Sequence, residues 1–184
     1  CHGQISRLSY AKNLFTAPMA ILGQAVGAAS LPFFATLFSQ NRRREFAAAV
    51  NSSVSRILAV SFLVSAWMIG LAYPAVDLVF RGGSFHHLDA NETSRYFVIF
   101  AVSLFLWTSQ AIYARAFYAA GNTIVPMVAG TVVTAVSLPI YYALYHLYGA
   151  IGLAFASDIG IAMQTLAIAA LLHQRHMVSL ASLD

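Results

Sequence analysis

Four stretches of this chain contain no Asp, Glu, Lys or Arg and are long enough to cross a bilayer. They are residues 13–41, 57–76, 96–114 and 116–157. A membrane-spanning helix needs about 20 mostly apolar residues. The chain is 60% hydrophobic and 9% charged, whereas soluble proteins are roughly 45–50% apolar and about 25% charged. These values indicate an integral membrane protein and exclude a disordered chain, a nucleic-acid-binding domain and an ordinary soluble enzyme.

The longest of these stretches is expected to cross twice, because Gly121-Asn122 and Tyr148-Gly149 favour chain reversal. We therefore predict an all-α fold, a polytopic membrane helix bundle in which residues 1–184 form a single partial transmembrane domain. The chain begins at Cys1 with no visible signal peptide, and we interpret it as a fragment of a larger protein. Its five expected helices are at about 5–39, 54–80, 94–120, 123–147 and 149–174, followed by a cytoplasmic tail at 175–184.

The basic residues predict the orientation of the helices. Arg42, Arg43 and Arg44 lie together in the first loop, and cytoplasmic loops of membrane proteins are enriched in Lys and Arg. This places the first loop and the tail inside, so that the chain starts outside and ends inside. Four tyrosines, from Tyr141 to Tyr148, then end the fourth helix at the outer interface. Residues 43–55 are expected to extend the second helix along the cytoplasm or the membrane surface.

No enzymatic motif accompanies the polar residues of the chain. There is no nucleophile elbow, no phosphate-binding loop and no zinc-protease motif. His86, His87 and Asp89 share a loop, but adjacent histidines do not face each other on a helix. We therefore expect no catalytic residues, no metal and no cofactor.

The first helix carries polar residues at membrane depth. Arg7, Lys12, Asn13 and Thr16 are spaced so that several share a face. One interpretation is that they line a water-filled cavity, as the polar faces of transporter helices do. The other is that Arg7 and Lys12 lie near the outer interface and extend their charged ends into water.

The same helix contains residues that bend it or bring a neighbour close. Pro18 interrupts the backbone hydrogen bonds and predicts a kink. Gly23 and Gly27 are four residues apart, which permits close packing of another helix.

Two further charges are expected within the membrane. Arg115 is near the inner end of the third helix, where a functional role and a simple interfacial position are both open. Asp158 is well inside the fifth helix, where an ionisable residue is a functional candidate or a buried partner for a cation or a hydroxyl.

Three segments resemble a known family. They read SYAKNLFTAPMAILGQAVGAASLP from Ser9 to Pro32, LVFRGGSF from Leu78 to Phe85, and RAFYAAGNTIVP from Arg115 to Pro126. In this order they are similar to the MviN/MurJ family of lipid II flippases, in the multidrug/oligosaccharidyl-lipid/polysaccharide exporter superfamily. Besides the first helix, the residues that match the family motifs are Gly82, Gly121, Asn122 and Pro126.

The resemblance implies a transporter of two lobes in the bacterial inner membrane, of which this chain would form most of the second lobe. Its activity would be to flip lipid II, a polyprenyl-pyrophosphate-linked saccharide, by alternating access around a cationic cavity, for cell-wall synthesis. The implied partners are membrane lipid, the lipid-linked substrate and the rest of the same polypeptide.

This chain departs from the family at one step of the first helix. Where the family commonly carries an acidic residue, Arg and Leu, this chain has Lys12-Asn13-Leu14. The cation is therefore shifted by one residue, roughly 100° around the helix. The family arginine matches Asn13. Either Lys12 binds the anion from a different angle, or this chain has lost that contact.

Two other functions remain open from the sequence. One is a related exporter of another lipid-linked saccharide or of a drug, although a drug exporter should carry more deep acidic residues than Asp158 alone. The other is a non-transporting membrane scaffold in cell-wall assembly, with which the departure at Lys12 and Asn13 is compatible.

Overall fold

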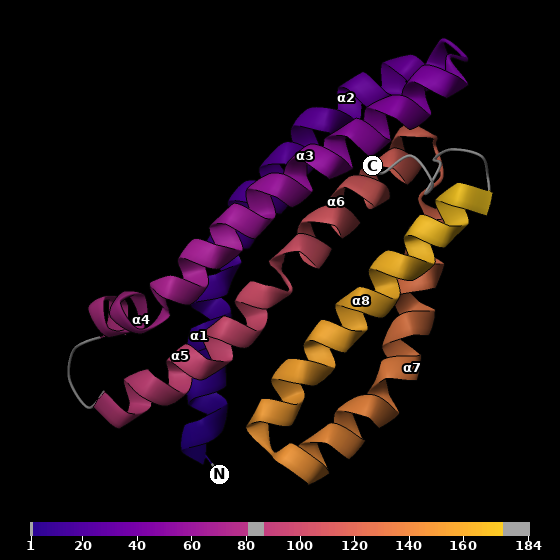
Figure 1. Cartoon of the computed structure of the whole chain (residues 1–184). Helices are drawn as coiled ribbons and strands as arrows, with labels where there is room; N and C mark the ends of the chain where they lie inside the picture. Colours follow the sequence, from indigo (N-terminus) through magenta and orange to yellow (C-terminus); the bar gives the residue numbers. More distant parts are fainter. Residues whose placement is uncertain (1, 81–86, 175–184) are drawn as a thin grey trace.

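The computed structural model describes residues 2–80 and 87–174, which are almost entirely helical. Gly82, His86 and the tail 175–184 lie outside the described residues. Figure 1 shows a bundle in which α2, α3 and α6 lie side by side, with a hairpin of α7 and α8 along one flank. The elements are α1 (His2–Met19), η1 (Ala20–Ala25), α2 (Val26–Ser39), α3 (Arg43–Gly70), α4 (Ala72–Phe80), α5 (His87–Val102), α6 (Leu104–Ala119), α7 (Ile124–Tyr148) and α8 (Ala150–Gln174).

The first span is continuous through α1, η1 and α2, and its middle turn is π-helical. Pro18 lies within α1 just before this turn, and its ring nitrogen cannot donate to the backbone of the preceding turn. A π-helical turn is one way in which a helix accommodates such an interruption. The interruption expected from the sequence therefore falls at residues 20–25.

The second span differs from the expected helix 54–80 at both ends. α3 begins at Arg43, directly after a tight turn in which Asn41 has a φ of 57°. Residues 43–55 are thus helical and continue into the span. The helix is broken at Leu71, between Gly70 and Pro74, and the short α4 then changes direction. Glycine and proline favour such a break because neither supports a helix interior.

The third span also differs from the single helix expected at 94–120. α5 begins at His87, and the span is broken at Ser103, where α5 and α6 meet at a bend of 42°. The Ser103 N–H donates to the Phe100 carbonyl at 3.1 Å, and its hydroxyl donates to the same oxygen at 3.0 Å. This three-residue turn replaces the regular α-helical hydrogen bond.

The hairpin of α7 and α8 turns at Gly149, which has a φ of 63°. Gly152 is buried against the end of α7, and a Cβ there would lie 2.5 Å from the carbonyl carbon of Leu144. α8 packs on α6, whereas α7 packs mainly on α8 and is the outermost helix of the hairpin (Figure 1).

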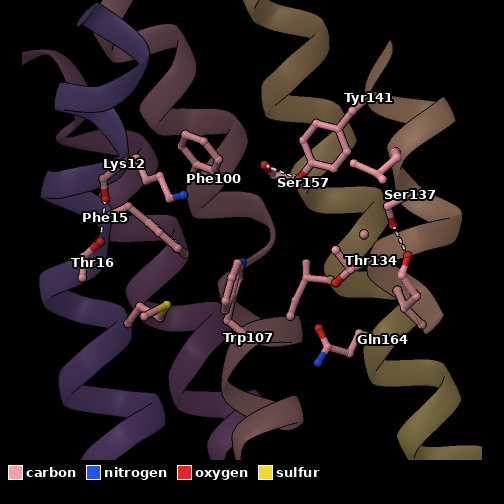
Figure 2. A pocket seen from close by; sticks show the side chains of 15 residues that line it. Lys12, Phe15, Thr16, Phe100, Trp107, Thr134, Ser137, Tyr141, Ser157 and Gln164 are labelled. Atoms are coloured by element: carbon pink, nitrogen blue, oxygen red, sulfur yellow. Dashed lines mark hydrogen bonds between the residues drawn. The ribbon is translucent and has the colours of Figure 1, made fainter. Parts of the chain in front are cut away.

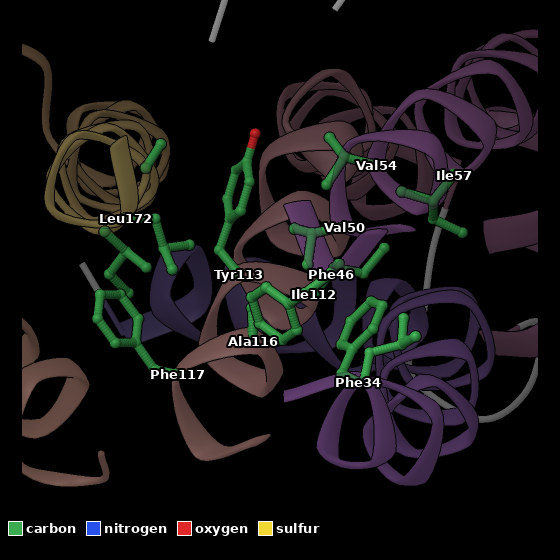
Figure 3. Close-up of a cluster of buried hydrophobic side chains, with 13 residues drawn as sticks. Phe34, Phe46, Val50, Val54, Ile57, Ile112, Tyr113, Ala116, Phe117 and Leu172 are labelled. Carbon is green, nitrogen blue, oxygen red and sulfur yellow. The ribbon is translucent and has the colours of Figure 1, made fainter. Parts of the chain in front are cut away.

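The buried apolar side chains form two clusters at opposite ends of the bundle. Figure 3 shows the cluster near the 40–42 turn, in which Phe34 and Phe46 pack edge to face with ring centroids 5.9 Å apart. The second cluster joins α1, α4, α5 and the start of α8 around Phe15 and Phe97.

Buried hydroxyl groups form contacts between the helices of the bundle. Ser61 of α3 and Thr108 of α6 share a hydrogen bond of 2.8 Å, and Thr165 of α8 lies 3.2 Å from the Leu106 carbonyl oxygen. Such hydroxyl contacts stabilise helix packing inside membranes.

Four helical segments of the described chain are long and apolar enough to cross a membrane, and α5 with α6 make a fifth if the bent pair is one span. The all-α polytopic bundle predicted from the sequence is therefore confirmed, and the chain is a multi-pass membrane protein.

Candidate functional site

A cavity of about 440 Å³ lies between α1, the α5–α6 span and the α7–α8 hairpin. Figure 2 shows its two walls, with α1 and the α5–α6 span on one side and the hairpin on the other. The first wall is largely apolar and aromatic, with Phe15, Phe100 and Trp107. The hairpin wall carries polar side chains, namely Thr134, Ser137, Tyr141, Ser157 and Gln164.

The cation of this cavity is Lys12. Its neighbours Ala11 and Phe15 are buried, which turns Lys12 and Thr16 toward the open side of α1. Figure 2 shows the Lys12 ammonium group pointing from α1 into the cavity. The Thr16 hydroxyl also faces this space and donates to the Lys12 carbonyl oxygen at 2.8 Å.

The other polar residues of α1 lie elsewhere. Asn13 is exposed and is not among the residues that line the cavity. The Arg7 guanidinium forms an ion pair with the Glu92 carboxylate of α5. The structure therefore brings Lys12 and Thr16 together and separates Arg7 and Asn13 from them.

Arg115 lies at a different level of the bundle, over η1 and α2. Its Nη2 donates to Gln24 Oε1 at 3.3 Å, and its side chain passes Gly27, where a Cβ would lie 3.3 Å from Arg115 Nε. A helix rises 1.5 Å per residue, so Gln24 is roughly 18 Å along the span from Lys12. Lys12 and Arg115 therefore belong to different sites.

Asp158 of α8 follows Ser157 but is not among the residues that line the cavity. It lies beside the Ser103 side chain, at the break between α5 and α6. Its Oδ1 is buried and has no hydrogen-bond partner among the described residues.

The glycines of the first span bring α6 close. A Cβ at Gly23 would lie 3.7 Å from the Ala111 Cβ, and Gly27 is buried against Arg115. This is the close helix neighbour that their four-residue spacing indicates.

The residues at 121–126 build the turn into α7. Gly121 has a φ of 73°, and the Asn122 Oδ1 accepts a hydrogen bond of 3.1 Å from the Val125 N–H. Pro126 is buried in the first turn of α7, where a missing N–H costs nothing.

Sequence reasoning did not identify most of the residues that line the cavity, among them Tyr141, Trp107 and Gln164. Tyr141, assigned above to the outer interface, lines the cavity and shares a hydrogen bond of 2.9 Å with Ser157. Trp107 and Gln164 were not singled out at all. A signal for the last exists, because Ser157, Ile161 and Gln164 are spaced as one face of a helix.

A polytopic helix bundle with broken spans beside a cavity that carries a cation and several polar side chains is typical of membrane transporters. The family model described as lipid II flippase MurJ matches residues 2–183. The chain therefore belongs to the MurJ family of lipid II flippases, as its sequence motifs indicate.

Individual relatives agree with this assignment. A probable lipid II flippase MurJ from Bdellovibrio bacteriovorus is 28% identical over 151 residues, which are 82% of this chain and 29% of the relative. One from Thermotoga maritima is 24% identical over 157 residues, 85% of this chain and 32% of the relative. A solved structure, lipid II flippase MurJ in an inward closed conformation, matches with a TM-score of 0.82 at 22% identity, over 98% of this chain and 37% of that one. The chain spans about a third of the length of the curated relatives it matches.

Proposed function

We propose that this chain is part of a bacterial inner-membrane flippase that moves lipid II, a polyprenyl-pyrophosphate-linked saccharide, during cell-wall synthesis. The observation that carries the proposal is Lys12, whose ammonium group faces the cavity and has no ion-pair partner among the described side chains. A pyrophosphate cannot enter a membrane interior alone, because an unpaired buried charge is very costly. A cation in a cavity offsets that cost through charge-assisted hydrogen bonds.

The rest of the cavity suits an amphiphilic anion. Its first wall is aromatic and apolar, and its hairpin wall carries hydroxyls and one amide. In the proposed mechanism the remainder of the polypeptide supplies the facing lobe, and the two lobes alternate in opening to each side. The apolar tail stays in lipid while the headgroup crosses between them.

Arg115 is proposed as a second cationic position of the same pathway. Its guanidinium is partly exposed, is held by Gln24 and lies over Gly27. Because its partner Gln24 is neutral, the charge of Arg115 stays available to an anion. Two cations separated along the span would let the headgroup move from one to the other.

The test uses the full-length protein in bacteria depleted of their own lipid II flippase. We expect the wild-type gene to restore growth and to restore access of an external probe to lipid II. Lys12→Ala should abolish both, and Lys12→Arg should retain part of them. Arg44→Ala, which removes an exposed cation of the 40–44 segment, is the matched control and should behave as wild type.

Two results would overturn the proposal at different levels. If the wild-type gene does not rescue the depleted cells, lipid II is not the substrate. If Lys12→Ala rescues as well as wild type, the substrate assignment stands and the role of Lys12 is wrong.

A second candidate is flipping of a different polyprenyl-linked saccharide. The observation that favours it is the step Lys12-Asn13, where the family commonly carries an acidic residue followed by Arg. Restored display of another lipid-linked saccharide, without rescue of the flippase-depleted cells, would select this alternative.

A further inference from the structure

The polar side chains of the hairpin wall differ in whether they already have hydrogen-bond partners within the protein. The Thr134 hydroxyl donates to the Gly130 carbonyl at 2.8 Å, and the Ser137 hydroxyl donates to the Val133 carbonyl at 2.7 Å. Tyr141 and Ser157 are paired with each other at 2.9 Å. The Gln164 side-chain amide has no hydrogen bond among the described residues.

The structure makes room for this amide on α7. A Cβ added at Gly130 would lie only 3.3 Å from Gln164 Nε2. The absence of a side chain at Gly130 thus lets the amide of α8 lie against the backbone of α7. Gln164 is therefore held at the cavity wall by the packing of the hairpin.

An aromatic side chain, Trp107, lies on the opposite wall. Trp107 lines the cavity, but its Nε1 is buried and has no hydrogen-bond partner among the described residues, so the residue offers its ring to the cavity rather than its N–H. Figure 2 shows Trp107 on the α6 side of the cavity and Gln164 on the hairpin side.

Lys12 and these two side chains give the cavity one charged part and one neutral part. Lys12 supplies a positive charge, whereas Trp107 supplies an aromatic ring and Gln164 an amide that both donates and accepts. A ring face beside neutral hydrogen-bonding groups suits a sugar, whose C–H face packs on the ring while its hydroxyl or acetamido groups bind the amide. The volume of about 440 Å³ is within the range of small-molecule sites.

We propose that Gln164 and Trp107 form a neutral subsite for the sugar ring attached to the pyrophosphate that Lys12 binds. This inference rests on the proposed function and adds to it the residues that distinguish a glycosylated lipid from a bare lipid pyrophosphate. Lys12 then gives affinity for both lipids, and the subsite gives selectivity.

The experiment measures binding of two probes to the purified full-length protein. One probe is undecaprenyl pyrophosphate, and the other is the same lipid carrying a disaccharide without a peptide. Gln164→Ala should weaken binding of the glycosylated probe about tenfold, the effect of losing one well-formed hydrogen bond. It should leave binding of the bare pyrophosphate within twofold, whereas Lys12→Ala should weaken both probes.

Gln174→Ala removes a second glutamine of α8, exposed and outside the cavity, and is the matched control for both probes. Trp107→Leu removes the aromatic ring from the cavity wall and provides an independent variant if Gln164→Ala does not fold. It should cause a loss that is again restricted to the glycosylated probe.

The subsite is refuted if Gln164→Ala and Trp107→Leu weaken both probes equally or neither. It is also refuted if a third probe, the disaccharide lipid with its peptide, shows the loss while the peptide-free disaccharide lipid does not, because the amide would then bind peptide. If the wild-type protein binds neither probe, the proposed function fails instead, so the two failures are distinguishable.

Discussion

The hairpin of α7 and α8 depends on the absence of a side chain at Gly152. A Cβ there would overlap the Leu144 carbonyl oxygen, and would lie 2.5 Å from the carbonyl carbon and 3.2 Å from the Tyr145 nitrogen. Non-bonded carbon atoms prefer separations of about 3.5–4.0 Å, so Gly152→Ala requires the two helices to separate by at least about 1 Å. Both neighbours are backbone atoms, which cannot rotate away. We therefore expect a destabilisation at the upper end of the overpacking range, about 3 kcal/mol.

The assay is thermal unfolding of the purified full-length protein in detergent, with Gly152→Ala and Gly160→Ala compared in parallel. Gly160 is in the same helix, but a Cβ there would meet only the Ser137 Oγ, at 3.5 Å, which is an ordinary contact. Gly160→Ala should be neutral or stabilising by up to about 1 kcal/mol, because alanine is the better helix former.

Equal unfolding temperatures for these two variants would refute the reasoning. The reasoning would also be refuted if Gly152→Ala were as stable as wild type, because the end of α7 would then move aside without any loss of stability. A large loss in Gly160→Ala alone would mean that the cavity wall is packed more tightly than the structure indicates.

Three further predictions concern packing and buried polar groups, each measured by unfolding of the full-length protein. Phe34→Ala should destabilise by about 3 kcal/mol, because Phe34 is fully buried, and a loss below about 1 kcal/mol would contradict this. Asp158→Asn should leave stability unchanged or raise it, because it removes the charge from a carboxyl group whose Oδ1 has no partner among the described residues. A double-mutant cycle of Ser61→Ala and Thr108→Val should give a coupling of about 0.6 kcal/mol, and simple additivity would mean that their hydrogen bond contributes nothing.

The membrane spans were predictable because the constraint on them is simple. Hydrocarbon excludes unpaired charge, so a charge-free run of sufficient length predicts a span without reference to the rest of the fold. The turns at Gly121 and Gly149 were also recognisable, and both residues have positive φ angles. Gly70 and Pro74 are local signals for the break at Leu71. The apolar run around them nevertheless predicts one unbroken helix at 54–80.

The break at Ser103 could not be read from the sequence in this way. No glycine or proline occurs between residues 94 and 120, and the surrounding residues are ordinary for a membrane helix. The serine hydroxyl takes over a backbone carbonyl, and Asp158 lies beside it from another helix. Ser137 makes a similar hydroxyl contact to a backbone carbonyl within the unbroken α7, so a serine in a span does not by itself indicate a bend.

The candidate site was partly predictable for a related reason. A lysine in a span is conspicuous wherever it lies, so Lys12 could be named at once. Gln164 and Trp107 are neutral residues within apolar runs, and such residues usually belong to helix packing. The folding of the hairpin toward α1 brings Gln164 opposite Lys12, and the packing of α6 places Trp107 on the same wall as Lys12. Both arrangements are tertiary.

Arg7 and Lys12, the two cations of α1, are expected to contribute differently to the stability of the protein without bound substrate. Arg7 is paired with Glu92, so Arg7→Met should lower the unfolding temperature, because it leaves a half-buried carboxylate without this partner. Lys12 has no ion-pair partner among the described residues, so Lys12→Met should leave the unfolding temperature unchanged or raise it while abolishing rescue of flippase-depleted cells. A residue kept for binding rather than for folding shows this combination of effects. If Lys12→Met instead lowers stability as much as Arg7→Met does, Lys12 has a structural role, and the anion must be bound elsewhere.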